Sequence, residues 1–182
     1  ATDHAYLDLT VATPLTPEEA LASFFSEDPN GTWTLRATDD VGGDIGTIVS
    51  WSLAMTTLTA PPGVLNFTGS SGTVNLPIPD SSGVPAGSTI PIVAAGTYIC
   101  DVEVTINVPH TWSDDLDVTL TSPSGTVVTL TSDNGGILND VYAGTTFDDD
   151  ANPAGQVPYT TNNGMATDHA YLDLTVATPL TP

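Results

Sequence analysis

Acidic side chains crowd into a few short stretches of this chain, and their chemistry is that of hard-cation binding. The stretches are residues 113–117, 133–134, 139–140 and 148–150. Calcium takes about six to eight oxygen ligands from carboxylates, amides and main-chain carbonyls, and glycine lets the main chain approach the ion. The stretches therefore favour calcium; the alternative is a solvated acidic rim of the kind typical of halophilic or marine proteins. No EF-hand spacing is present, so the pattern does not single out ligands.

Histidine and cysteine are too sparse for a zinc site, and no catalytic pattern accompanies them. The chain has three histidines, His4, His110 and His169, and a single cysteine, Cys100. A Ser-His-Asp hydrolase needs a nucleophile beside a base that a third group orients. Neither a nucleophile elbow nor a subtilase-like serine motif is present, so we expect no enzyme within these residues. Cys100 excludes an intramolecular disulfide and is expected to be a buried, inert thiol.

The balance of charge excludes two classes of partner. One basic side chain, Arg36, stands against 22 Asp and Glu residues, for a formal net charge of −21 over 182 residues. Binding to nucleic acid or to an anionic membrane requires Lys or Arg to replace counterions. We therefore expect no nucleic-acid binding. We also expect no membrane insertion, because no stretch approaches the roughly 20 apolar residues of a membrane span. No signal peptide opens the chain, and a mature secreted segment would look the same.

The elements that must hold the acidic loops follow a period of two residues. Apolar and polar side chains alternate over residues 102–108, which places four apolar side chains on one face of a strand. The same alternation predicts strands at residues 7–11, 33–37, 51–55 and 116–120. Turn residues separate these strands, so we predict an all-β antiparallel β-sandwich or jelly roll. One short helix is predicted at residues 16–25, with a loop as the alternative.

Two groups of motifs carry a family resemblance. The first group comprises residues 27–36 (EDPNGTWTLR), 44–48 (DIGTI) and 50–53 (SWSL). The second comprises residues 110–112 (HTW), 115–126 (DLDVTLTSPSGT), 132–136 (SDNGG) and 145–149 (TTFDD). The first group resembles the closing strands, and the second the opening half, of the P domain (homo B domain) that follows the catalytic domain of proprotein convertases. Residues 132–136 and 145–149 have the form that bacterial members carry.

The resemblance implies roles for individual residues. It implies that His110 belongs to the β-sandwich framework, and that calcium is a cofactor bound near the acidic loops. The candidate calcium ligands are Asp115, Asp117, Asp133, Asp148 and Asp149. We also expect a location outside the cell or at the cell surface.

The order of the motifs and an exact repeat determine the expected domain organisation. Residues 1–17 recur letter for letter as residues 166–182. In the family the half resembling residues 100–149 comes first, whereas here it comes second. We therefore divide the chain into residues 1–60, which close one P-like sandwich; a linker, 61–63; and residues 64–182, which open the next sandwich or the same sandwich in permuted form. An appended duplicate tail is the alternative explanation of the repeat.

Two arrangements satisfy the repeat. In one, identical units follow each other in a long polypeptide, and each closes its own sandwich. In the other, the chain is a whole subunit whose closing strands come from its own N-terminal part or from a neighbour by strand addition. The exchangeable element would be residues 6–13 and their copy, 171–178. Its apolar and aromatic residues are Tyr6, Leu7, Leu9, Val11, Tyr171, Leu172, Leu174 and Val176.

The expected function follows from the repeat, the charge and the resemblance together. We expect a calcium-stabilised structural unit of an extracellular fibre, sheath or adhesive stalk, with copies of itself as partners. One alternative is the accessory P domain of a secreted subtilisin-like serine protease. Another is a carbohydrate-binding or adhesin module that uses Trp33, Trp51 or Trp112, although packing in the core is the preferred interpretation of the first two.

Overall fold

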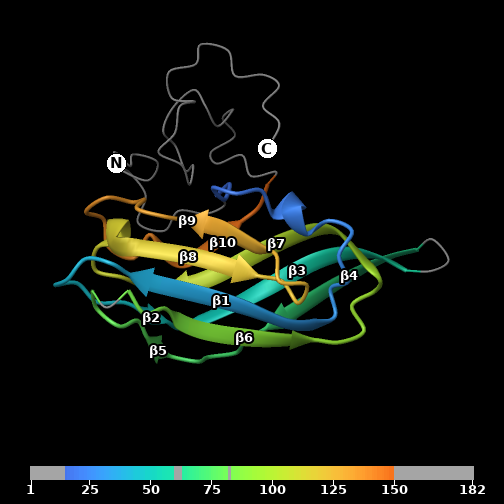
Figure 1. The fold of residues 1–182 in the computed structure, drawn as a ribbon, viewed down its shortest axis with the longest axis horizontal. Coiled ribbons are helices and arrows are strands. Elements are labelled where there is room, and N and C mark those ends of the chain that lie inside the picture. The colour runs from blue at the N-terminus through green and yellow to red at the C-terminus, as the bar shows by residue number, and fades with distance from the viewer. Residues whose placement is uncertain (1–14, 60–62, 82, 150–182) are drawn as a thin grey trace, which may run out of the picture.

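The fold consists almost entirely of short strands joined by turns. A computed structural model describes residues 15–59, 63–81 and 83–149 (Figure 1). Two 3-10 turns are present, η1 (Leu21–Phe24) and η2 (Ser113–Asp115). The strands are β1 (Gly31–Asp39), β2 (Thr47–Ile48), β3 (Ser50–Thr59), β4 (Gly63–Ser70), β5 (Leu76–Pro77), β6 (Ala86–Ile92), β7 (Tyr98–Val108), β8 (Leu116–Thr121), β9 (Val127–Thr131) and β10 (Tyr142–Phe147).

Two four-stranded sheets face each other. One has the order β6-β1-β8-β9 and the other the order β10-β7-β3-β4. All neighbouring strands in both sheets pair antiparallel. The view in Figure 1 looks through the first sheet onto the second. A small sheet of β2 and β5 lies beside them. The predicted all-β antiparallel sandwich is confirmed.

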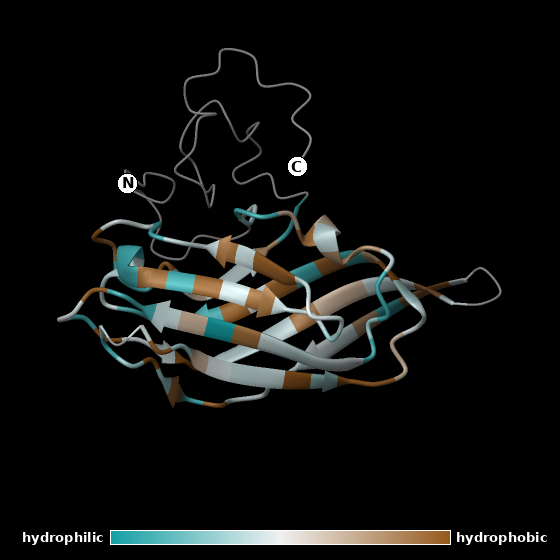
Figure 2. Ribbon diagram, in the orientation of Figure 1, coloured by the Kyte–Doolittle hydropathy of each residue, from teal (hydrophilic) through white to brown (hydrophobic). Residues whose placement is uncertain are grey.

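Alternation of side chains builds the core between the sheets. In β1 the buried residues include Trp33, Leu35 and Ala37, and each alternates with a more exposed residue. β3 does the same from the opposite sheet with Trp51 and Leu53. Figure 2 shows this alternation as hydrophobic and hydrophilic bands along the strands. Because side chains of a strand point to opposite faces, each sheet gives one apolar face to the shared core.

The strands expected at residues 33–37, 51–55, 102–108 and 116–120 are confirmed as β1, β3, β7 and β8. The strand expected at residues 7–11 lies outside the described residues. The helix expected at residues 16–25 is reduced to the single turn η1. Cys100 is half-buried, and its Sγ lies 3.1 Å from the main-chain oxygen of Thr56. Among the residues that the structure describes, no helix is long and apolar enough to cross a membrane.

Strands from both sides of residues 61–63 share the sandwich. β1 pairs with β6 and β8, and β3 pairs with β7 and β4. Described strands from both sides of the expected linker therefore belong to the same two sheets. Strands β3 and β4 pair directly on either side of residues 60–62, with Thr59 opposite Gly63. The second copy of the repeat, residues 166–182, lies outside the described residues.

A short segment, residues 15–19, closes the side of the sandwich where β9 and β10 lie; we call it the strap. Leu15 donates its main-chain N–H to Thr146 (2.7 Å) and accepts one from Asp148 (2.9 Å). The strap then passes to the other sheet, where Glu18 and Glu19 donate their N–H groups to main-chain oxygens of β9 (3.1 and 3.0 Å). The strap thus ties the two sheets together along one edge.

Candidate functional site: an acidic pocket beneath the strap

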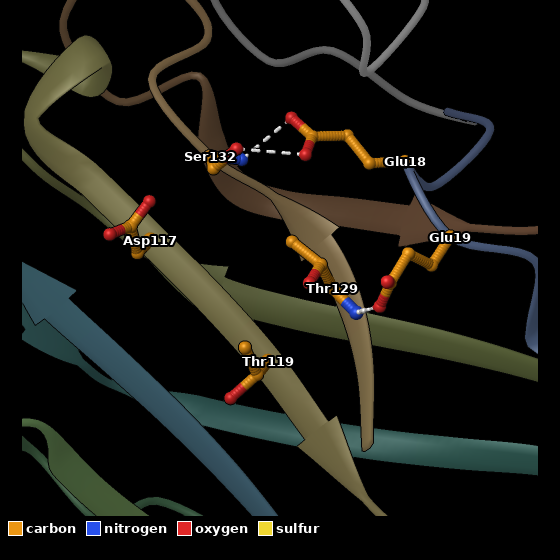
Figure 3. A pocket seen from close by; sticks show the side chains of 6 residues that line it. All are labelled: Glu18, Glu19, Asp117, Thr119, Thr129 and Ser132. Carbon is orange, nitrogen blue, oxygen red and sulfur yellow. Dashed lines mark hydrogen bonds between the residues drawn. The ribbon is translucent and has the colours of Figure 1, made fainter. Parts of the chain in front are cut away.

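The pocket lies where the strap passes over β8 and β9. Its volume is about 450 Å³. Asp117 and Thr119 are two residues apart on β8, so their side chains lie on the same face. Thr119 lies directly opposite Thr129 of β9. Figure 3 shows these side chains with Glu18 beside Ser132 and Glu19 beside Thr129. The lining residues are Glu18, Glu19, Asp117, Thr119, Thr129 and Ser132.

The two glutamates of the pocket are anchors of the strap. The carboxylate of Glu18 accepts hydrogen bonds from the main-chain N–H and the hydroxyl of Ser132, both at 2.8 Å, and from Nδ2 of Asn134 at 2.5 Å. The carboxylate of Glu19 accepts the main-chain N–H of Thr129 at 2.6 Å (Figure 3). Hydrogen bonds to ionised acceptors are stronger than neutral ones, so these contacts hold the strap on β9.

Asp117 is in a different electrostatic situation. The pKa of its carboxyl is raised from the ordinary value of 3.8 to about 6, first by burial and then by the nearby carboxylates of Asp133, Asp40 and Glu18. Loss of solvation and like charges both disfavour the ionised form. The pocket therefore places negative charge at a point where a proton or a cation would relieve repulsion.

A second set of acidic side chains is buried near the start of β8. Asp39, the last residue of β1, is fully buried, and its Oδ2 lies 3.2 Å from Nε2 of His110. The other oxygen of Asp39 has no hydrogen-bond partner. Buried Asp115 lies nearby. The pKa of Asp115 is raised to about 6, first by burial and then by the charge of Asp39, whereas His110 opposes the shift. We call Asp39, His110 and Asp115 the buried cluster.

His110 is fixed by the framework on every side. Its Nδ1 lies 3.1 Å from the main-chain nitrogen and 2.6 Å from the main-chain oxygen of Trp112. The main chain of Gly46 packs against its ring, so that a Cβ at residue 46 would lie 2.2 Å from Cδ2 of His110. Both ring nitrogens are therefore engaged by groups that belong to the sandwich, which is the framework position implied by the family resemblance.

The five candidate calcium ligands fall in separate places. Asp117 and Asp133 interact electrostatically at the pocket, whereas Asp115 belongs to the buried cluster. Asp149 accepts the main-chain N–H groups of Leu21 and Ala22 at 2.9 and 2.8 Å and so caps η1. Asp148 lies near Glu103, whose pKa is raised by burial first and then by that neighbouring charge.

No group of three or more His, Cys, Asp or Glu side chains within residues 15–59, 63–81 and 83–149 is arranged to hold a metal ion. The candidate assembly residues Tyr6, Leu7, Leu9, Val11, Tyr171, Leu172, Leu174 and Val176 lie outside the described residues.

Three acidic residues of these sites were missed by sequence reasoning: Glu18, Glu19 and Asp39. A signal for Asp39 was present, because the inward phase of β1 through Leu35 and Ala37 continues to residue 39. Nothing local marked the glutamates, since the donors that Glu18 meets lie 114 and 116 residues away in the chain.

Comparison with known proteins agrees with the motifs. No curated protein and no solved structure matches the chain. A family model described as the proprotein convertase P-domain matches residues 8–55 and 99–165. The described parts of these two segments contain both 3-10 turns and most strands of both sheets. They also contain the buried cluster and all residues that line the pocket. This domain is an accessory, non-catalytic part of proteases. The chain belongs to the proprotein convertase P-domain family.

Proposed function

We propose that this chain is the accessory P domain of a secreted subtilisin-like serine protease, in which it supports the folding of a catalytic domain. The observation that carries the proposal is the family match, which covers strands from both sheets of one closed sandwich. The ring nitrogens of His110, the one described histidine, face Trp112 and Asp39, which also supports a framework role for this residue. An extracellular location is part of the same proposal.

The test uses the native polypeptide that contains this domain. An antibody against the domain identifies that polypeptide on a denaturing gel, and a fluorophosphonate probe labels active-site serines. We expect the antibody-reactive band to be larger than 18.7 kDa and to take the probe. Heat-denatured sample is the control for non-specific labelling. An antibody-reactive band that never takes the probe in an active extract contradicts the proposal.

A second candidate function is the structural repeat of an extracellular fibre, sheath or stalk. The observation that favours it is the exact repeat of residues 1–17 at residues 166–182. Units of identical sequence joined in tandem are typical of extended arrays. On the same gel this candidate predicts a ladder whose steps correspond to one 165-residue unit, with no probe labelling.

Calcium binding stays a prediction, and the arrangement of its five candidate ligands does not fit one shared ion. Asp149 is already engaged in capping η1, and Asp115 is buried beside Asp39. We propose titration calorimetry with calcium, and thermal unfolding in excess calcium and in excess chelator, with magnesium as the control cation. Binding to the folded state raises the unfolding temperature by mass action. Unchanged unfolding in chelator and a flat titration would refute it.

A further inference from the structure

Among the described residues, β4 is the one edge strand of the sandwich without a feature that prevents further pairing. The ends of the two sheets are β6, β9, β10 and β4 (Figure 1). The strap donates main-chain N–H groups to β9, and Leu15 pairs with the end of β10. β6 contains Pro91, and proline has no N–H to offer to a further strand. β4 contains neither proline nor a charged residue, which are the usual protections of an edge.

The main chain of β4 presents a row of hydrogen-bonding groups at this edge. Ser71, which follows β4, donates its main-chain N–H to the main-chain oxygen of Trp51 in β3 at 3.0 Å. In an antiparallel pair, residues that bond to the neighbouring strand alternate with residues that do not. The odd-numbered residues of β4 therefore bond to β3. The N–H and C=O groups of Val64, Asn66 and Thr68 face the free edge.

The surface around this edge lacks the negative charge that dominates the rest of the chain. Residues 45–79 contain no Asp, Glu, Lys or Arg, although the formal net charge of the chain is −21. β6, which lies next to β4 where Ile92 approaches Gly69, is uncharged as well. Val64 of β4 is 67% exposed. Because like charges repel, β4 is an edge along which two acidic copies can meet without bringing carboxylates together.

We propose that β4 of one copy of this chain pairs antiparallel with β4 of a second copy, which joins the β10-β7-β3-β4 sheets of the two copies into one. A second copy fits because a two-fold axis places the free N–H and C=O groups of one β4 opposite those of the other. The contact is isologous, since the same strand serves on both sides, so the assembly closes as a dimer. This interaction goes beyond the accessory function and does not depend on it.

Sedimentation of the full chain over a range of concentrations measures the association. We expect an equilibrium between monomer and dimer that tightens when salt is added. Salt screens the repulsion between two chains of net charge −21, and the paired edges contain no ion pair that salt would weaken. A chain that stays monomeric up to millimolar concentration in high salt overturns the proposal.

A charge on β4 tests where the copies meet. Asn66→Asp brings two carboxylates close together across the paired strands, so we expect the dimer to weaken at least about tenfold. The matched control Asn107→Asp makes the same change on β7, which β3 separates from the edge, and should leave the equilibrium unchanged. Equal dimerisation of Asn66→Asp and Asn107→Asp overturns the proposal.

Mixing two variants covers the case that Asn66→Asp weakens the dimer by disturbing the fold. Asn66→Lys places the opposite charge at the same residue. A mixture of Asn66→Asp and Asn66→Lys should associate more tightly than either variant alone, because each copy then meets a charge of opposite sign. A mixture that associates no more tightly than the separate variants contradicts the pairing of β4 with β4.

Hydrogen exchange provides an internal control within β4. The N–H groups of Val64, Asn66 and Thr68 should gain protection as the concentration rises, whereas those of Leu65 and Phe67 bond to β3 and are protected throughout. Dimerisation without new protection at the first three amides means that the copies meet elsewhere. Protection of these amides in the monomer means that another segment of the same chain covers β4. Either result overturns the proposal.

Discussion

The acidic pocket and the buried cluster use the same kind of side chain with opposite consequences. At the pocket, Glu18 meets three donors, two of them from Ser132, so its charge is compensated and holds the strap. In the buried cluster, Asp39 has one oxygen near His110 and one with no partner, and Asp115 adds a second carboxyl nearby. The supply of hydrogen-bond donors, and not the number of carboxylates, therefore decides whether acidic residues stabilise this sandwich.

The largest expected effect comes from breaking the buried cluster. His110→Ala removes the partner of Asp39 Oδ2 and leaves a fully buried carboxyl with no partner. Removing one member of a buried pair costs about 3 kcal/mol or more, so we expect the free energy of unfolding to fall by that amount. Urea unfolding followed by tryptophan fluorescence measures it.

His110→Gln is the matched control for this prediction, because its amide nitrogen reaches toward the position of Nε2. It should recover part of the loss. Equal stability of His110→Ala and the unaltered chain would show that the buried pair contributes nothing, and the contrast between the two acidic regions would then disappear.

The next largest loss of stability is expected at the pocket, where Glu18 anchors the strap. Glu18→Ala removes three hydrogen bonds to an ionised acceptor and leaves the Ser132 N–H without this acceptor, whereas Nδ2 of Asn134 keeps the main-chain oxygen of Ser132 at 2.8 Å. We expect a loss of about 2 kcal/mol in the free energy of unfolding. Glu19→Ala is the control and should cost less, since exposed Glu19 accepts a single bond, from Thr129. Equal losses in the two variants would contradict the anchoring role of Glu18.

These two regions also show how far the sequence predicts the molecule. The alternation of β1, β3, β7 and β8 predicts their faces because the signal lies within each strand. Its continuation to Asp39 predicts that this carboxyl points into the core. The pocket could not be predicted in this way, because it forms only where residues 18 and 19 meet β9 across the closed sandwich. The five candidate calcium ligands are scattered for a local reason: Asp115 ends η2 whereas Asp117 lies on β8, and the adjacent Asp148 and Asp149 have different neighbours.

A smaller effect is expected where a carboxylate caps a turn. Asp149→Ala removes the acceptor for the N–H groups of Leu21 and Ala22 and leaves the start of η1 uncapped. We expect a loss of about 1 kcal/mol, as for other capping residues. Asp149→Asn keeps one acceptor oxygen and should lose about half as much. Hydrogen exchange at Leu21 and Ala22 locates the effect, and unchanged exchange at these two amides would refute the cap.

The last effect is a pH dependence that distinguishes Asp117 from its anchored neighbour, and solvent screening of the half-buried Asp117 keeps it small. The folded state raises the pKa of Asp117 from 3.8 to about 6, so between these values the folded chain holds a proton that the unfolded chain has released. Stability contributed by this group therefore falls as the pH rises from about 4 to 6, and the loss is complete above that window. Asp117→Asn removes the contribution of this carboxyl to the fall in stability with pH. The variant should match the stability of the unaltered chain near pH 4 and exceed it at pH 7.

Asp115 has a raised pKa in the same window, so the variant keeps part of the slope, and Asp115→Asn is the matched comparison. Urea midpoints from pH 4 to 7.5 measure the difference between the curves. Parallel curves would mean that the pocket compensates Asp117 as fully as it compensates Glu18, because only an uncompensated carboxylate gains stability from its proton.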